Sequence, residues 1–149
     1  MTAARRVDQN ALRTHQAILI IVLLVAYVLD LHLLVAFAAA VMIIGALYPP
    51  ARLFVLLYKH VLRRTGLIQP EIITDNPEPH RFSMAVGAIF LTASTIALLA
   101  DVATVGWVLM FIVVVLAAIN LFLGFCAGCF MYYQLNKLGV PGFEYAPIQ

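Results

Sequence analysis

The most constraining feature of this chain is an apolar stretch that is too long to be one membrane helix. It runs from Ala17 to Tyr48 and is interrupted only by Asp30 and His32. As a single helix it would be about 48 Å long, against roughly 30 Å of bilayer hydrocarbon. The stretch must therefore turn back, and Asp30 is the expected corner because aspartate readily caps a following helix. We predict a first span near residues 12–29 and a second near 32–48.

The second half of the chain has the same organisation. Residues 83–100 are apolar, Asp101 interrupts them, and the apolar sequence then resumes, which predicts spans over 83–100 and 103–130. Hydrophobic residues make up 64% of the chain and charged residues only 11%, whereas soluble domains carry about 25% charged residues. The sequence therefore predicts an all-α integral membrane protein, a single domain with four transmembrane helices arranged as two hairpins in the lipid bilayer.

The basic residues predict the orientation in the membrane. They lie before the first span, between the second and third, and after the fourth, and neither expected hairpin tip contains one. The positive-inside rule places such segments in the cytoplasm, so both termini and the loop 49–82 are expected there. A net charge of +2 gives no reason to expect nucleic-acid binding.

The central loop carries a pattern of its own. Apolar residues recur at helical spacing from Pro50 to Arg64, which predicts an amphipathic helix lying in the membrane interface. A helix that docks a partner protein is the alternative interpretation. Pro70, Pro77 and Pro79 predict that the stretch behind it is extended.

Small and polar residues predict where the fourth span contacts another helix. Gly124 and Gly128 form a Gly-x-x-x-Gly motif, which allows two helix backbones to approach closely. Asn120 lies one turn earlier, and its amide is expected to bond to another helix. The candidate partners are hydroxyl side chains of the third span: Thr92, Ser94 and Thr95. These hydroxyls can equally bond carbonyls of their own helix.

Cys126 and Cys129 are the two cysteines of the chain. A Cys-x-x-Cys pair can cycle between dithiol and disulfide, bind a soft metal or carry sulfur. On a continuing helix, residues three apart share a face, so the two thiols are expected to meet at the cytoplasmic edge. Alternatively, both are small apolar packing residues among glycine and alanine. The residues alone leave these two interpretations open.

Other chemistry near the cysteines is sparse in the sequence. A metal site would need two further ligands, and although His60 and His80 lie on the same side, the spacing of a soft-metal motif is absent. No metal and no cofactor are therefore predicted. The nearest lysine or arginine in sequence is Lys137, so activation of a thiol is expected from the central loop or from a helix terminus.

Several segments together resemble the bacterial membrane family called domain of unknown function 4395. They are Val7-Asp8-Gln9-Asn10, Pro79-His80-Arg81-Phe82 leading to Gly87, and Asn120 followed by Gly124-Phe125-Cys126-Ala127-Gly128-Cys129 with Tyr132. The Gly-Phe-Cys-x-Gly-Cys element is the most specific of them. The resemblance implies a four-helix protein of the bacterial inner membrane. Family members are often found beside thioredoxin-like or rhodanese-like proteins, which implies thiol or sulfur chemistry.

Two classes of function follow from these observations. In the first, Cys126 and Cys129 exchange thiols or sulfur with a thioredoxin-like or rhodanese-like partner in the cytoplasm. In the second, the chain is a non-catalytic structural or accessory subunit of a larger membrane complex, and the cysteines only pack. Whether the chain is an enzyme is left open. A transporter is less well supported, because the expected spans contain no ion pair and no interrupted helix.

Overall fold

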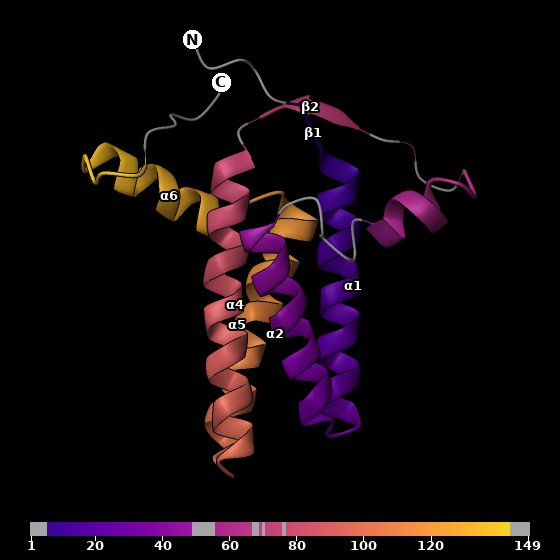
Figure 1. Cartoon of the computed structure of the whole chain (residues 1–149), viewed down its shortest axis with the longest axis vertical. Helices are drawn as coiled ribbons and strands as arrows, with labels where there is room; N and C mark the ends of the chain where they lie inside the picture. Colours follow the sequence, from indigo (N-terminus) through magenta and orange to yellow (C-terminus); the bar gives the residue numbers. More distant parts are fainter. Residues whose placement is uncertain (1–5, 49–55, 67–68, 70, 76, 144–149) are drawn as a thin grey trace.

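The structure is a computed structural model that describes residues 6–48, 56–66, 69, 71–75 and 77–143. It is mainly helical, as predicted (Figure 1). The helices are α1 Gln9–Val28, α2 His32–Leu47, the π-helical turn η2 Tyr58–Leu62, α4 Pro77–Leu99, α5 Ala103–Leu123 and α6 Ala127–Lys137. Two short strands are also present, β1 Arg6–Asp8 and β2 Ile72–Thr74.

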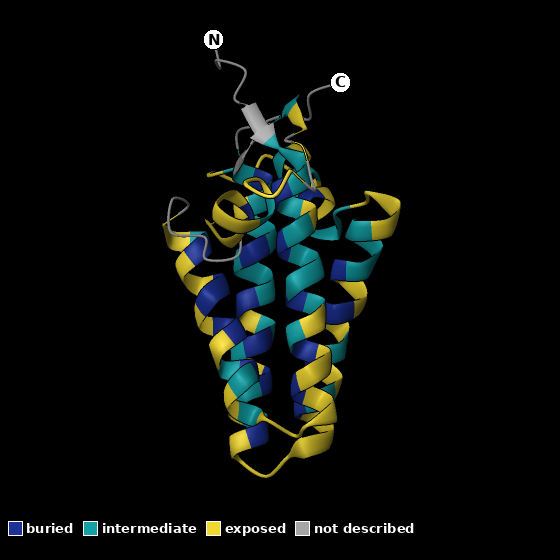
Figure 2. Ribbon diagram, turned by 90° about the vertical axis from the view of Figure 1, so that its right-hand side faces the viewer, coloured by how far each residue is buried: buried dark blue, intermediate teal, exposed yellow. Residues whose placement is uncertain are grey.

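α1, α2, α4 and α5 lie side by side as a bundle, and α6 turns away near its upper end (Figure 1). α2 packs chiefly against α4, while α5 packs against both α4 and α1. Figure 2 shows the buried residues on the facing sides of these helices, with exposed residues concentrated toward the lower end. The buried side chains form one apolar cluster contributed by all four helices.

Within the described part of the chain, three helices are long and apolar enough to cross a membrane: α1, the part of α4 from Glu78 to Leu99, and α5. α2 is also apolar but has only 16 residues. Large apolar side chains point outward from the bundle; Leu33 and Phe122, for example, are 79% and 80% exposed. This surface is consistent with contact between the helices and a lipid bilayer.

Asp30 and Asp101 lie at the two lower turns, but they do not act as caps of the following helices. Both adopt a left-handed backbone conformation, with φ of 52° and 59°. The next residue, Leu31 or Val102, donates its N–H back to the carbonyl of Ala26 or Ala97. This is the Schellman arrangement that closes the preceding helix, and aspartate tolerates its left-handed position better than most residues. The corners were therefore predicted at the right residues for a partly wrong reason.

Small residues bring α4 and α5 together. Ser94 is fully buried and donates its hydroxyl to the carbonyl of Gly106 on α5, at 2.7 Å. Thr92 and Thr95 instead donate to carbonyls one turn earlier in their own helix. The three hydroxyls proposed as partners of Asn120 are thus engaged elsewhere.

The central segment differs from the prediction at the start of α4. Pro77 and Pro79 lie in the first turn of this helix, where proline is accommodated because the first N–H groups of a helix have no intrahelical partner. The third long helix therefore begins before residue 83, and the extended stretch is shorter than predicted.

The predicted interfacial helix can be compared only in its second half, because residues 49–55 lie outside the described residues. Residues 56–62 are helical, and the turn behind them ends at Gly66, which has φ of +72°. Tyr58 is completely buried, and η2 contacts α1. This part of the segment therefore packs on the bundle through its tyrosine.

The sequence analysis did not predict the strand pair. β1 and β2 are antiparallel, with Arg6 opposite Thr74 and Asp8 opposite Ile72. Asp8 also caps α1 by accepting the N–H of Ala11 at 3.2 Å. The pair fixes the chain that follows β2 above the start of α1, and so determines where Asp75 lies.

Candidate functional site

The two cysteines occupy the first turn of a new helix instead of the end of α5. α5 ends at Leu123 because Gly124 adopts a left-handed conformation, with φ of +67°. Cys126 is then the N-cap residue of α6, and Cys129 lies within its first turn. The predicted fourth span to residue 130 therefore ends too late, since the helix stops before the cysteines.

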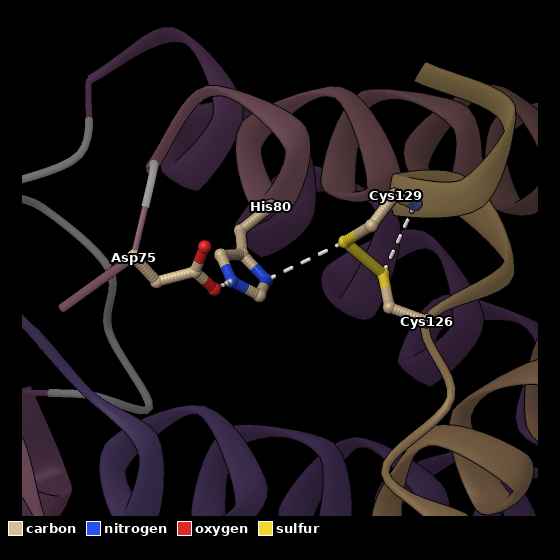
Figure 3. A network of polar contacts seen from close by, with 4 residues as sticks. All are labelled: Asp75, His80, Cys126 and Cys129. Carbon is tan, nitrogen blue, oxygen red and sulfur yellow. Dashed lines mark hydrogen bonds and ion pairs between the residues drawn. A yellow bond between two sulfur atoms is a disulfide. The ribbon is translucent and has the colours of Figure 1, made fainter. Parts of the chain in front are cut away.

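Cys126 and Cys129 form a disulfide (Figure 3). The Sγ of Cys126 also accepts the backbone N–H of Cys129, at 3.2 Å. A sulfur at the N-cap of a helix faces free N–H groups and the positive end of the helix dipole, which favour a thiolate over a thiol. In the reduced protein, this position therefore stabilises a Cys126 thiolate. Of the two sources of thiol activation expected from the sequence, the central loop and a helix terminus, α6 supplies the second.

The interruption after α5 separates the two glycines of the predicted packing motif. A Cβ atom added at Gly124 would meet no atom within 4 Å, so this glycine provides a backbone turn and no helix contact. A Cβ atom at Gly128 would lie 2.6 Å from the Cβ and Oγ of Ser83 on α4. The prediction of one shared Gly-x-x-x-Gly face is therefore wrong for Gly124, while Gly128 lies where α6 crosses α4 closely.

His80, which belongs to α4, lies next to the disulfide. Its Nδ1 lies 3.6 Å from the Sγ of Cys129, and its Nε2 lies 3.0 Å from the Oδ2 of Asp75 (Figure 3). An ionised carboxylate only accepts hydrogen bonds, so Asp75 holds the imidazole with its proton on Nε2. The lone pair of Nδ1 is then directed at sulfur. In the reduced protein, Asp75, His80 and Cys129 would therefore form a continuous path along which a proton can leave the Cys129 thiol.

The two cysteines differ in how far they are buried. Cys129 is 8% exposed and sits beside His80, whereas Cys126 is only partly buried. An incoming sulfur group therefore reaches Cys126 more easily than Cys129. This difference is the usual division between an attacking cysteine and a second cysteine that resolves the mixed disulfide.

Tyr133 of α6 completes the polar surroundings. Burial raises the pKa of its phenol above the ordinary value of 10.0, and the negative charge of Asp75 raises this pKa further. The phenol therefore stays protonated at neutral pH and is able to donate a hydrogen bond.

A cavity of about 480 Å³ lies directly beside the pair. Cys126, Cys129, His80 and Asp75 all line it, as does Asn120 of α5. The predicted contact of Asn120 with a third-span hydroxyl does not form; the side chain instead belongs to the wall of this cavity.

Three ligand atoms for a soft metal also meet here. The Nδ1 or Nε2 of His80 and the sulfurs of Cys126 and Cys129 lie within 4.8 Å of one another. His60, the other histidine considered from sequence, is exposed and bonds the carbonyl of Leu56 in its own helix. Sequence reasoning noted His80 but did not connect it to Asp75, because 5 residues and a change from strand to helix separate the two. The Pro-His-Arg-Phe segment was the available signal.

Comparisons with known proteins identify the family. The family model described as domain of unknown function (DUF4395) matches residues 7–137. No curated protein and no solved structure matches the chain. The matched range includes Asp75, His80 and both cysteines, and it covers most of the sequence. The chain therefore belongs to the DUF4395 family.

Proposed function

We propose that the protein is a small multi-pass membrane protein that carries out thiol–disulfide exchange through Cys126 and Cys129. The observation that carries this proposal is the position of His80, which links the Asp75 carboxylate to the sulfur of Cys129. A pair of cysteines that served only to pack the fold would need neither a partly exposed N-cap sulfur nor an oriented imidazole.

The geometry suggests a complete exchange step. The Cys126 thiolate attacks a partner disulfide, an S–S bond forms to the partner, and one partner thiolate leaves. Cys129 then gives its proton to Nδ1 of His80, and its sulfur attacks Sγ of Cys126. The Cys126–Cys129 bond forms, the mixed disulfide breaks, and the second partner thiolate takes up the proton. Two electrons and the proton of Cys129 pass to the partner. The first partner thiolate takes up from solvent the proton that Cys126 released when it ionised, so both partner sulfurs end as thiols, and the reverse sequence regenerates the dithiol.

For the membrane arrangement, we propose four spans, with α2 as the fourth crossing helix alongside α1, α4 and α5. The 16 residues of α2 contain no lysine, arginine, aspartate or glutamate. They cover about 24 Å, somewhat less than the roughly 30 Å hydrocarbon core. No lysine or arginine occurs from residue 14 to 51 or from 82 to 136, the two regions that contain the lower turns. Under the positive-inside rule, the disulfide end of the bundle and both termini face the cytoplasm of a bacterial inner membrane.

This orientation limits the classes of protein that can be the redox partner. Thiols in the cytoplasm are kept reduced, so a disulfide there is transient and is used in catalysis or sensing. A thioredoxin-like protein supplies a suitable dithiol or disulfide, and a rhodanese-like protein would deliver sulfur to the same thiolate. We favour the thioredoxin-like partner, because two paired cysteines with one proton relay match a two-electron exchange.

Trapping of the partner tests the proposal. With Cys129→Ser, the mixed disulfide on Cys126 cannot be resolved, so a covalent complex should accumulate in membranes from cells treated with an alkylating agent. Cys126→Ser is the matched control and should trap nothing. The contrary outcome has two parts: both serine variants trap nothing, and the double variant Cys126→Ala/Cys129→Ala keeps full activity in cells. In that case the cysteines only pack, and the accessory-subunit interpretation is correct.

A soft-metal site is the second candidate, favoured by the three ligand atoms that lie within 4.8 Å. In it, Asp75 would orient the metal-binding histidine, as carboxylates commonly do. Reduced protein titrated with Co²⁺ distinguishes the two functions. Stoichiometric binding with thiolate-to-metal absorption that is lost in His80→Gln supports the metal site, whereas no retained Co²⁺ supports exchange alone.

A further inference from the structure

We propose that the cavity beside the disulfide binds a quinone and that this quinone exchanges electrons directly with Cys126 and Cys129. The inference rests on the proposed thiol–disulfide function and adds the second redox partner that this function requires. It is carried by the position, lining and volume of the cavity.

The cavity leads from the cysteines into the membrane part of the bundle. Both cysteines line one part of it, and Leu19, Phe90 and Val113 line another. On α1, the lining extends from Gln9 to Leu19, which is about 15 Å along the helix axis. α1, α4 and α5, which are long and apolar enough to cross a membrane, form one part of the wall, and the segment 124–133 with α6 forms most of the rest. A molecule that fills the cavity must therefore be mostly apolar and can arrive from the lipid.

The lining combines an apolar wall with a few polar groups. Gln9, Arg13 and Gln16 follow one another at helical spacing on α1, and Asn120 faces the same space from α5. These four side chains can all donate hydrogen bonds. They lie within the half of their helices that is nearest the cysteines. The volume of about 480 Å³ falls in the range of roughly 300–1,000 Å³ that is typical of small-molecule sites.

A quinone satisfies each of these conditions. Its ring and isoprenoid chain are apolar, its two carbonyl oxygens accept hydrogen bonds, and an aromatic wall residue such as Phe90 can stack on the ring. Its reduction takes two electrons and two protons, the same numbers that a dithiol releases when it forms a disulfide.

Electrons, protons and bonds balance in the transfer from the dithiol to the quinone. One cysteine sulfur adds to a ring carbon of the quinone, and the electron pair of the ring moves onto a carbonyl oxygen. The other sulfur attacks the first, so the S–S bond forms, the carbon–sulfur bond breaks, and its electron pair remains on the ring. The two thiol protons end on the two quinol oxygens, with His80 carrying the proton of Cys129. The products are one disulfide and one quinol.

A cavity-filling variant with a matched neighbour tests this inference. Ala117 is buried and lines the cavity, while Ala118, the next residue, does not line it. Fully reduced protein in lipid nanodiscs is mixed anaerobically with menadione, a short naphthoquinone. Disulfide formation is followed by alkylation and mass spectrometry, and quinol formation by absorbance. In parallel, each variant is oxidised by a soluble disulfide. For each variant, the rate of oxidation by menadione is divided by the rate of oxidation by the soluble disulfide, and this ratio is compared between variants.

We expect one quinol for each disulfide, and we expect Ala117→Phe to lower the rate ratio by about tenfold or more relative to Ala118→Phe, as loss of a bound ligand requires. Ala117→Leu gives the same comparison if the phenylalanine variant does not fold. Equal ratios in the Ala117 and Ala118 variants, or a stable carbon–sulfur adduct without disulfide, would overturn the inference. Oxidation by the soluble disulfide but not by menadione would overturn it and leave the proposed exchange intact. Oxidation by neither would reject both.

Discussion

The imidazole Nδ1 of His80 lies 3.6 Å from the Sγ of Cys129, although 49 residues separate the two in sequence. The contact forms because α4 begins, and α5 is followed by α6, at the same end of the bundle. A histidine so placed can accept the proton of a buried thiol while a carboxylate fixes its other nitrogen. The contact turns a Cys-x-x-Cys motif of ambiguous meaning into a site with an acid–base group.

His80→Gln should slow the resolving half of thiol exchange, because Cys129 loses the group that takes its proton. General acid–base groups contribute about 10²- to 10⁴-fold to such steps, and we expect a loss within that range. Stopped-flow reduction of a small disulfide by the reduced protein measures the rate. His60→Gln is the control, because His60 is exposed and bonds the carbonyl of Leu56 in its own helix. Equal rates for the two variants would show that His80 is not involved in proton transfer.

Gly124 and Gly128 should respond oppositely to asparagine. Gly124→Asn places a residue that tolerates the left-handed conformation where no atom lies within 4 Å, so stability should hardly change. Gly128→Asn drives its Cβ against Ser83 of α4 and should cost about 1–3 kcal/mol, as overpacking usually does. Thermal unfolding in detergent measures both. A stable Gly128→Asn protein would mean that α6 does not cross α4 as closely as the structure shows.

Labelling from outside the cell tests the membrane orientation. In a background without native cysteines, Val102→Cys at the lower turn should react with an impermeant maleimide added to intact cells. Gln134→Cys, on an exposed position of α6, should react only after the membrane is opened. The reverse pattern would place the disulfide end outside and would remove the cytoplasmic partners from the proposal.

Alkaline stability should depend on Tyr133. Its pKa is raised in the folded protein above the ordinary value of 10.0, so the folded state holds the phenolic proton more tightly than the unfolded state does. The resulting stabilisation is complete below about pH 10 and is lost as the pH rises through the folded value. Tyr133→Phe should therefore lose less stability than the wild type between pH 9 and about pH 11. Thermal unfolding at both pH values measures this, with Tyr48→Phe, an exposed tyrosine, as control. Identical losses in the wild type and Tyr133→Phe would show that Tyr133 does not contribute.

Much of the helical architecture could be predicted from sequence, because length and hydropathy limit how an apolar chain can fold. The corners at Asp30 and Asp101 were found as interruptions of apolar runs, although their left-handed conformation was not. The end of α5 was missed because Gly124 is followed by further apolar residues, so hydropathy gives no sign of a break there. Only the backbone conformation at this glycine shows that a new helix begins at Ala127.

The candidate site was only half predictable. Cys126 and Cys129 stand out by their spacing, and the lack of nearby charge in the sequence predicted that either the central loop or a helix terminus activates the thiols. Their partners His80 and Asp75 could not be assigned, since contacts between distant segments depend on how α4, α6 and the strand pair are arranged. The cavity is likewise formed by several helices, so the polar residues that α1 contributes at helical spacing could not be assigned to it from the sequence.

A redox titration of the purified protein tests the central claim most directly. The protein is equilibrated anaerobically in buffers of graded dithiol and disulfide composition, alkylated, and weighed by mass spectrometry. We expect a single reversible transition in which Cys126 and Cys129 gain or lose their alkyl groups together, with a midpoint roughly between −270 and −120 mV, the range of catalytic dithiols. Thiols that remain alkylated in every buffer, or a disulfide that is reduced only when the protein unfolds, would contradict it.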